Sequence, residues 1–206
     1  MAETVIIPAA DDDAIADWLC GRLTKALAAT DDTVAITVPG GSTPFPILKR
    51  LTEKALDWAR LDVWPGDDRL VPEDHEASNA GRIRALLEPV GATVTALSKD
   101  ATPPHFALAW LGMGNDGHIA SLFSNTDPQP DDRKLVRRLT PKPLPPEAPF
   151  ERISLTIPAL INSDELLFVI RGADKRALFE QAMRGKNDLP VARLLRAAST
   201  HVTCFT

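Results

Sequence analysis

His118 is the residue of this sequence best placed to carry out chemistry. It lies in the stretch LGMGNDGHIASLF, residues 111–123, directly after the apolar run FALAWL. Histidine is the side chain best suited to moving protons near neutral pH. The glycines of the stretch permit positive φ angles and the close approach of a ligand. We therefore expect His118 to be catalytic, although a solvated histidine in a capping loop is the plain alternative.

The local structure around His118 decides whether Asp116 can assist it. Asn115 or Asp116 could cap a helix that begins near Gly117, with His118 in its first turn. Residues two apart do not share a face of a regular helix, so contact between the two side chains needs the geometry of the cap. The sequence leaves that contact open.

Two further stretches carry groups that suit a phosphorylated ligand. In PGGSTP, residues 39–44, two glycines and two hydroxyls precede a helix start, whose N–H groups can bind phosphate oxygens. A capped turn explains this stretch equally well, and its spacing matches neither a Walker loop nor a dinucleotide fingerprint. Arg69 follows Asp67 and Asp68, and it could either hold a phosphate in a bidentate manner or form a surface ion pair with them.

Lys175 is another candidate for binding an anion. It falls in the first turn of a helix that we expect Asp174 to cap. A cation at that place opposes the helix dipole, which favours an anionic ligand close by, although surface lysines are common.

Alternating strands and helices must position these residues. Apolar runs without alternation are typical of strands buried on both faces, and amphipathic segments separate them. The strands are expected at residues 33–38, 61–64, 92–97, 105–111, 152–157, 165–170 and 200–205. The helices are expected at residues 13–29, 44–59, after a Ser78 cap, 174–185 and 190–195. The order predicts one domain, residues 1–206, with a three-layer α/β/α fold and a mostly parallel, Rossmann-like sheet. The proline-rich segment 124–151 reads as a surface insertion with a strand at 134–139.

The direction of the chain in such a sheet brings the candidate residues together. Loops that follow parallel strands emerge at one edge of the sheet, where ligands bind. We therefore expect four loops to meet, at residues 40–43, 66–69, 114–118 and 171–175. Each loop is unremarkable alone, but together they hold most of what a phosphorylated substrate requires.

Composition narrows the class of protein. The formal net charge is -5, which gives no general attraction to nucleic acid or to an anionic membrane, so an anion would need a local cationic cluster. No apolar run approaches the roughly 18 residues that span a bilayer, and we expect a cytoplasmic protein. Cys20 and Cys204 lack metal-ligand spacing and are read as reduced thiols.

Several blocks of the sequence resemble the 6-phosphogluconolactonase family, in the same order along the chain. They are GGSTP (40–44), DDRLVP (67–72), SN (78–79), LGMGNDGHIASLF (111–123), RISLTIPAL (152–160) and GADKRALFE (172–180). The acidic pair before Arg69 and the ASLF continuation of the glycine loop resemble the lactonases more than the related glucosamine-6-phosphate deaminases.

The resemblance implies a fold, a reaction and a set of residues. The fold is that of the sugar-phosphate isomerases, and the reaction is hydrolysis of 6-phospho-D-glucono-1,5-lactone to 6-phosphogluconate, the second step of the pentose phosphate pathway, with no metal or organic cofactor. His118 would be the general base and Asp116 would orient it. The residues expected to bind the substrate and its phosphate are Gly40, Gly41, Ser42, Thr43, Asp67, Arg69, Gly114, Arg152 and Lys175.

Two other functions stay open at this point. The chain could be a sugar-phosphate isomerase or glucosamine-6-phosphate deaminase, or a regulator that binds a sugar phosphate without turning it over. Its expected partner is a small sugar-phosphate lactone rather than nucleic acid or a membrane, and we expect a monomer or a weak homo-oligomer.

Overall fold

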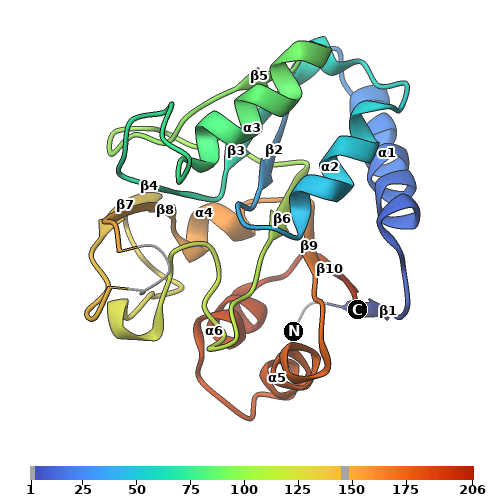
Figure 1. The fold of residues 1–206 in the computed structure, drawn as a ribbon. Coiled ribbons are helices and arrows are strands. Elements are labelled where there is room, and N and C mark those ends of the chain that lie inside the picture. The colour runs from blue at the N-terminus through green and yellow to red at the C-terminus, as the bar shows by residue number, and fades with distance from the viewer. Residues whose placement is uncertain (1–2, 145–148) are drawn as a thin grey trace.

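A seven-stranded parallel sheet forms the centre of the molecule (Figure 1). The computed structural model describes residues 3–144 and 149–206. The strand order is β1-β10-β9-β6-β2-β3-β5. The strands are β1 (Thr4–Ile7), β2 (Val34–Val38), β3 (Leu61–Pro65), β5 (Thr93–Val94), β6 (Leu108–Leu111), β9 (Glu165–Val169) and β10 (His201–Phe205). The edge strand β1 is half-exposed and was not predicted from the sequence.

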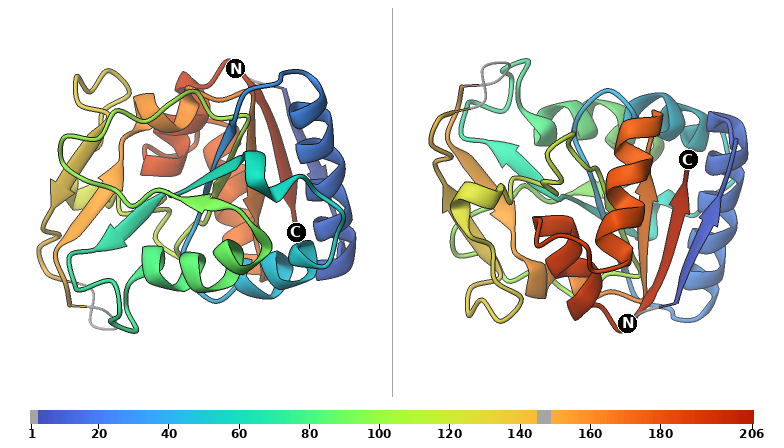
Figure 2. Two further views of the ribbon diagram at one scale, coloured as in Figure 1. Left: turned by 90° about the horizontal axis from the view of Figure 1, so that it is seen from above. Right: turned by 90° about the horizontal axis from the view of Figure 1, so that it is seen from below.

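Helices cover both faces of this sheet, as the apolar runs predicted. One group is α1 (Asp12–Ala28), α2 (Pro44–Thr52) and α3 (Asn79–Leu87), and the other is α4 (Ile157–Ile161), α5 (Ala173–Met183) and α6 (Pro190–Ala197). Each group packs on its own hydrophobic core. Strand β9 supplies both cores in alternation, with Leu166 and Phe168 in one and Leu167 and Val169 in the other. In Figure 2 the blue-to-green helices and the orange-to-red helices lie on opposite sides of the sheet. The three-layer α/β/α prediction is confirmed.

A second, antiparallel sheet was not predicted. It has the order β4-β8-β7, with β4 at Asp67–Arg69, β8 at Arg152–Leu155 and β7 at Val136–Leu139. The predicted strand at 134–139 is therefore confirmed. Residues 67–69, expected as a loop, form a strand, and the strand at 152 belongs to this sheet instead of the parallel one. Gly66 links the two sheets, because its N–H donates to Val38 (2.9 Å) and its carbonyl accepts from Leu155 (2.9 Å).

Some element boundaries also differ from expectation. The helix expected over 44–59 ends at Thr52, and residues 58–60 form a short 3-10 helix, η1 (Trp58–Arg60). The last buried residue on the face of α2 is Leu51, and Trp58 is the next large side chain to be buried. The helix therefore ends where its buried apolar stripe ends. The four residues 145–148 of the predicted surface insertion lie outside the described residues.

Candidate active site

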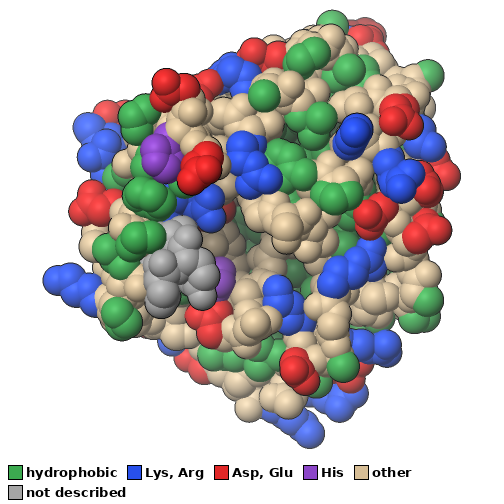
Figure 3. All heavy atoms as spheres, in the orientation of Figure 1, with side chains coloured by type: hydrophobic (Ala, Val, Ile, Leu, Met, Phe, Trp, Pro, Cys, Tyr) green, Lys and Arg blue, Asp and Glu red, His purple; other side chains and the backbone are tan. Residues whose placement is uncertain are grey.

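The strand order reverses between β2 and β6, and a cavity lies at that point. The chain continues from β2 toward β3 and β5 on one side, and from β6 toward β9 and β10 on the other. The loops after β2 and β6 therefore diverge and leave a crevice at the carboxyl edge, the usual ligand site of an open α/β sheet. A cavity of about 320 Å³ opens there. Figure 3 shows this face hollowed, with Lys and Arg side chains around the hollow.

Residues from all four predicted loops line this cavity, so the prediction that these loops meet is confirmed. The lining includes Gly40, Gly41, Ser42, Thr43, Asp67, Asn79, Arg69, Gly114, His118, Arg171 and Lys175. Of the residues predicted from the sequence, Asp116 and Arg152 are not among the described residues of the cavity wall.

The loop after β2 offers free hydroxyls at the start of a helix. Thr43 is the N-cap of α2, but it makes no side-chain capping hydrogen bond. In the described part of the chain, neither the Ser42 nor the Thr43 hydroxyl has a hydrogen-bond partner. The capped-turn alternative, in which a side-chain hydroxyl caps the helix, is therefore wrong. Gly41 has a φ of +91° and open space beside it, which suits close approach of an anion to the backbone.

Asp68 anchors the neighbouring helix instead of facing the cavity. Its carboxylate accepts from the N–H groups of Asn79 (2.6 Å) and Ala80 (3.0 Å) and from the Ser78 hydroxyl (3.2 Å). Ser78 in turn caps α3, since its Oγ accepts from the N–H of Gly81 (3.1 Å). The predicted Ser78 cap is confirmed.

Arg69 and Asn79 form a fixed pair on the cavity wall. Arg69 Nη1 donates to the Ala77 carbonyl (2.8 Å) and to Asn79 Oδ1 (3.3 Å), while Asn79 Nδ2 donates to the Asp67 carbonyl (2.8 Å). Gly40 packs against the same amide, and a Cβ there would overlap the Asn79 side chain. Asn79 was not predicted as a site residue. The sequence signal for it was the SN block, which was read as a helix start and as one block of the family resemblance, with no role given to Asn79.

Asp67 is a buried carboxyl in the same wall of the cavity. It is 9% exposed and accepts a short hydrogen bond from the Ser121 hydroxyl. Burial raises the pKa of Asp67, against the effect of the Ser121 hydrogen bond and of the charges on Arg69 and Arg152. Arg152 is 3% exposed and pairs with Arg69 in the β4–β8 register. Burial and the Arg69 charge lower the pKa of Arg152, and Asp67 and Asp68 oppose this.

The loop after β6, residues 112–123, forms a compact turn that we call the histidine turn. No helix follows Gly117, so that prediction is wrong. Gly117 has a φ of +77° and Ala120 a φ of +47°, and neither value can belong to a right-handed helix. The turn is closed by hydrogen bonds from Gly114 N to the His118 carbonyl (2.9 Å) and from Gly117 N to the Gly114 carbonyl (3.1 Å).

Within the histidine turn, Asp116 contacts His118 directly. The Asp116 Oδ1 and His118 Nδ1 atoms are 2.5 Å apart, and the same oxygen accepts from the His118 N–H (3.2 Å). The imidazole also lies on the Phe123 ring, with centroids 4.3 Å apart, and against Gly114, where a Cβ would overlap it. Burial works to raise the pKa of Asp116, but the charge and hydrogen bonds of His118 outweigh it and lower that pKa. The question that the sequence left open is therefore answered.

This arrangement leaves one ring nitrogen without a described partner on His118, a residue of the cavity wall. In the part of the chain that the structure describes, Nε2 has no hydrogen-bond partner. If Nδ1 carries the proton and donates it to Asp116, Nε2 holds the lone pair of a base. A carboxylate in contact with Nδ1 can orient an imidazole for proton transfer.

The loop after β9 supplies two cations. Lys175 lies in the first turn of α5, but Gly172, with a φ of +98°, is the N-cap, so the predicted Asp174 cap is wrong. Lys175 forms no ion pair with any described residue. Arg171 also lines the cavity, and it donates to the Ala10 carbonyl (2.9 Å) and to Asp12 Oδ1 (3.1 Å). Arg171 was not predicted as a site residue, although it belongs to the predicted loop 171–175 and directly follows a strand, the same signal that placed Arg69.

The described residues show neither a metal cluster nor a membrane-spanning helix. Within residues 3–144 and 149–206, the His, Cys, Asp and Glu side chains form no group of three suited to a metal ion. None of the described helices has both the length and the apolar character needed to cross a membrane.

Comparison with known proteins points to one family. The model of the glucosamine-6-phosphate isomerases/6-phosphogluconolactonase family matches residues 9–97 and 90–204. A 6-phosphogluconolactonase of Neisseria meningitidis is 33% identical over 218 residues, covering 94% of this chain and 91% of that protein. One of Pseudomonas aeruginosa is 34% identical over 210 residues, with coverages of 90% and 87%. The crystal structure of 6-phosphogluconolactonase from Thermotoga maritima superposes with a TM-score of 0.82 at 25% identity, covering 98% of this chain and 99% of that one.

Proposed function

The chain belongs to the family of glucosamine-6-phosphate isomerases and 6-phosphogluconolactonases, and we propose that it hydrolyses 6-phospho-D-glucono-1,5-lactone with His118 as general base. Its reaction is that of a carboxylic ester hydrolase in carbohydrate metabolism, the second step of the pentose phosphate pathway. The observation that carries the proposal is the contact of Asp116 with His118 Nδ1 at 2.5 Å, which leaves Nε2 without a described partner on a residue that lines the cavity.

His118 performs both proton transfers of the hydrolysis. Nε2 takes a proton from a water molecule as that water attacks the lactone carbonyl carbon, which gives a tetrahedral oxyanion. When the oxyanion collapses, the bond to the ring oxygen breaks and the imidazolium returns its proton to that oxygen. Asp116 holds the imidazole with its proton on Nδ1 and stabilises the imidazolium between the two steps.

The oxyanion needs a donor, and the histidine turn offers few. The N–H groups of Gly114 and Gly117 already donate to carbonyls inside the turn. A cation of the cavity wall is the better donor, and Arg69 suits this role because its Nη2 has no partner among the described residues. Gly114 serves as a small surface on which the imidazole and the sugar can lie close together.

The 6-phosphate binds at the loop after β2, which lines the cavity. Gly40, Gly41, Ser42 and Thr43 present hydroxyls and the N-terminus of α2, a helix of nine residues. Lys175 and Arg171 add positive charge beside that loop. Asp67 and Arg152 belong to the small sheet: Asp67 lines the cavity, and Arg152 influences the site through its neighbour Arg69. This local cationic cluster reconciles an anionic substrate with a net charge of -5.

The decisive experiment follows the lactonase reaction of the His118→Ala variant. Freshly prepared lactone is supplied, 6-phosphogluconate is measured with a coupled dehydrogenase, and the spontaneous rate is subtracted. General acid–base catalysis contributes about 10²- to 10⁴-fold, so turnover should fall by that factor while affinity for 6-phosphogluconate stays close to wild type. Full activity of His118→Ala would contradict the general-base role. Ammonia release from glucosamine 6-phosphate, or binding of the lactone without turnover by the wild type, would favour a deaminase or a regulator instead.

Other features of the protein remain predictions. We propose that residues 1–206 act as a single domain, in the cytoplasm, as a monomer or weak homo-oligomer, with no cofactor. Size-exclusion chromatography with light scattering measures the oligomeric state directly.

A further inference from the structure

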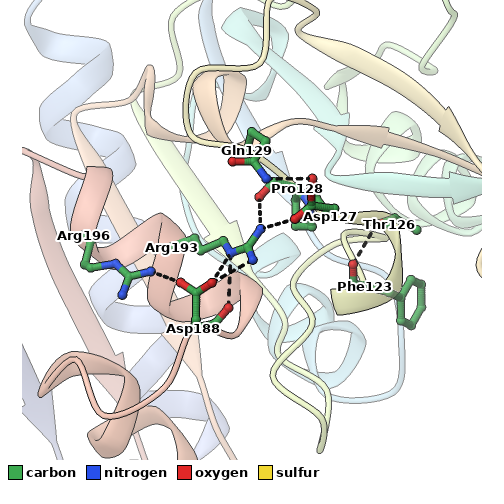
Figure 4. A network of polar contacts seen from close by, with 8 residues as sticks. All are labelled: Phe123, Thr126, Asp127, Pro128, Gln129, Asp188, Arg193 and Arg196. Atoms are coloured by element: carbon green, nitrogen blue, oxygen red, sulfur yellow. Dashed lines mark hydrogen bonds and ion pairs between the residues drawn. The ribbon is translucent and has the colours of Figure 1, made fainter.

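Arg193 of α6 joins two segments that are distant in sequence. Its Nη1 donates to Asp127 Oδ1 (2.7 Å) and to the Pro128 carbonyl (3.0 Å), across 66 and 65 residues. Its Nη2 and Nε donate to Asp188 Oδ2 (2.7 and 3.0 Å). The side chain is only 20% exposed. Figure 4 shows the guanidinium between Asp127 and Pro128 on one side and Asp188 on the other.

Asp127 ends a short turn that begins at Phe123. The 3-10 helix η3 (Ser124–Thr126) follows Phe123, and the Phe123 carbonyl accepts from Thr126 N (2.9 Å) and Thr126 Oγ1 (2.8 Å). Asp127 itself has a φ of +46°, in the left-handed region that Asp and Asn adopt more readily than other residues with a side chain. Its N–H donates to the Ser124 carbonyl (3.3 Å), so the contact with Arg193 fixes the end of this turn and reaches Phe123 through it.

The start of α6 also holds the other side of His118. Val191 N donates to the Gly117 carbonyl (3.1 Å), and the Leu189 side chain packs so closely on Gly117 that a Cβ there would approach it to 2.7 Å. Residues 117–127, which we call the clamped segment, are thus attached to residues 188–193 at both ends.

The clamped segment contains the group that supports the imidazole. Phe123 lies under the His118 ring, with centroids 4.3 Å apart. A shift of Phe123 removes this support and lets the imidazole turn about its bond to the backbone, which moves Nε2. A misplacement of about 1 Å costs an enzyme on the order of 10²-fold in rate. The carboxylates that Arg193 contacts are exposed, with the Asp127 side chain 72% and the Asp188 side chain 61% exposed, so these ion pairs contribute little to the stability of the fold.

We propose that Arg193 is a positioning residue, which fixes the His118 imidazole by clamping the loop that carries Phe123. The inference rests on the proposed role of His118 as general base. Arg193 would act without touching the substrate, because it is not among the described residues that line the cavity.

The test compares Arg193→Met with Arg193→Lys and with a control on the same helix. Arg196→Met is the control, because Arg196 contacts Asp188 but neither Asp127 nor Pro128. We expect Arg193→Met to lower kcat at least about tenfold with KM within twofold, Arg193→Lys to restore part of kcat, and Arg196→Met to behave as wild type. Asp127→Asn, which keeps a residue that tolerates positive φ, should lower kcat in the same direction. Thermal melts establish that each variant is folded at the assay temperature.

A double-mutant cycle separates positioning from a general structural effect. If Arg193 acts through His118, adding Arg193→Met to His118→Ala should not lower the residual rate further. Multiplied losses in the double variant, or wild-type kcat in both Arg193→Met and Asp127→Asn, would overturn the inference. A fully active His118→Ala would instead overturn the general-base proposal on which the inference rests, so the two failures are distinguishable.

Discussion

Replacement of Asp116 by Asn tests the contact that gives His118 its role. The change keeps the size of the side chain but removes its charge. The amide can also present its NH₂ group to Nδ1, which would place the imidazole proton on Nε2, the wrong nitrogen for a base. Both effects act on the catalytic step, and the cavity wall itself is unchanged because Asp116 is not among its described residues.

The size of the effect follows from the geometry of the pair. Two unit charges about 4 Å apart interact by about 1 kcal/mol in bulk water and by about 4 kcal/mol at the effective dielectric of a protein surface. The Asp116 side chain is 60% exposed and that of His118 30% exposed, which favours the lower half of this range. Loss of about 1 to 2.5 kcal/mol of stabilisation of the imidazolium lowers kcat by about 5- to 70-fold. KM should stay within twofold of wild type.

A second histidine–carboxylate pair supplies the matched control. His105 Nε2 lies 2.8 Å from Asp164 Oδ1, on the surface and away from the described lining of the cavity. The coupled dehydrogenase assay is run on Asp116→Asn and Asp164→Asn with spontaneous hydrolysis subtracted. Asp164→Asn should match wild type. If Asp116→Asn retained its kcat, or changed only KM, the carboxylate would not act on the catalytic imidazole and the mechanism would be refuted.

Two further predictions concern the charged groups of the cavity. Lys175→Ala and Arg171→Ala should each raise KM for the phosphorylated lactone, since a hydrogen bond to a charged group is worth about 1.5–3 kcal/mol. KM for unphosphorylated glucono-1,5-lactone should stay the same. Equal effects on both lactones would exclude a phosphate contact. Asp67→Asn should gain thermal stability relative to wild type as pH rises. Burial raises the pKa of Asp67. Its stabilising contribution is present below the unfolded pKa, about 3.9, and is lost as pH rises through the folded value. Melting temperatures of both proteins from about pH 4 to about pH 7 give the sign, and a difference that does not change with pH contradicts it.

The parallel sheet and the meeting of the loops were predictable because both depend on properties that the sequence states directly. Strands such as Val34–Val38 and Glu165–Val169 are mostly apolar, with Thr37 and Glu165 as the exceptions, and every residue in both is buried. Once such strands alternate with helices, the direction of the chain sends the loops after them to one edge. The meeting of Asp67, His118 and Lys175 could therefore be predicted without knowing their contacts.

The small sheet was not predictable in this way. Asp67–Arg69 has the polar sequence of a loop, and it becomes a strand only because β8, more than eighty positions away, pairs with it. The same limit applies to the histidine turn, where glycines and an aspartate suit a helix cap and a tight turn equally well. The chain takes the turn, with positive φ angles at Gly117 and Ala120 and with bridges of Ile119 to Met113 and Leu122.

The type of a residue indicates which reaction it can take part in, but its orientation is set by neighbouring residues that do not react themselves. His118 could be selected from the sequence because imidazole is suited to proton transfer, and Asp116 because it stands close by. The supports of the imidazole are an aromatic ring, a glycine surface and an arginine on another helix, and each of these is common in any protein. Their role exists only where the chain brings Phe123 under the ring and Arg193 onto Asp127. Sequence reasoning therefore reaches the reacting groups of such a site first and its positioning groups last.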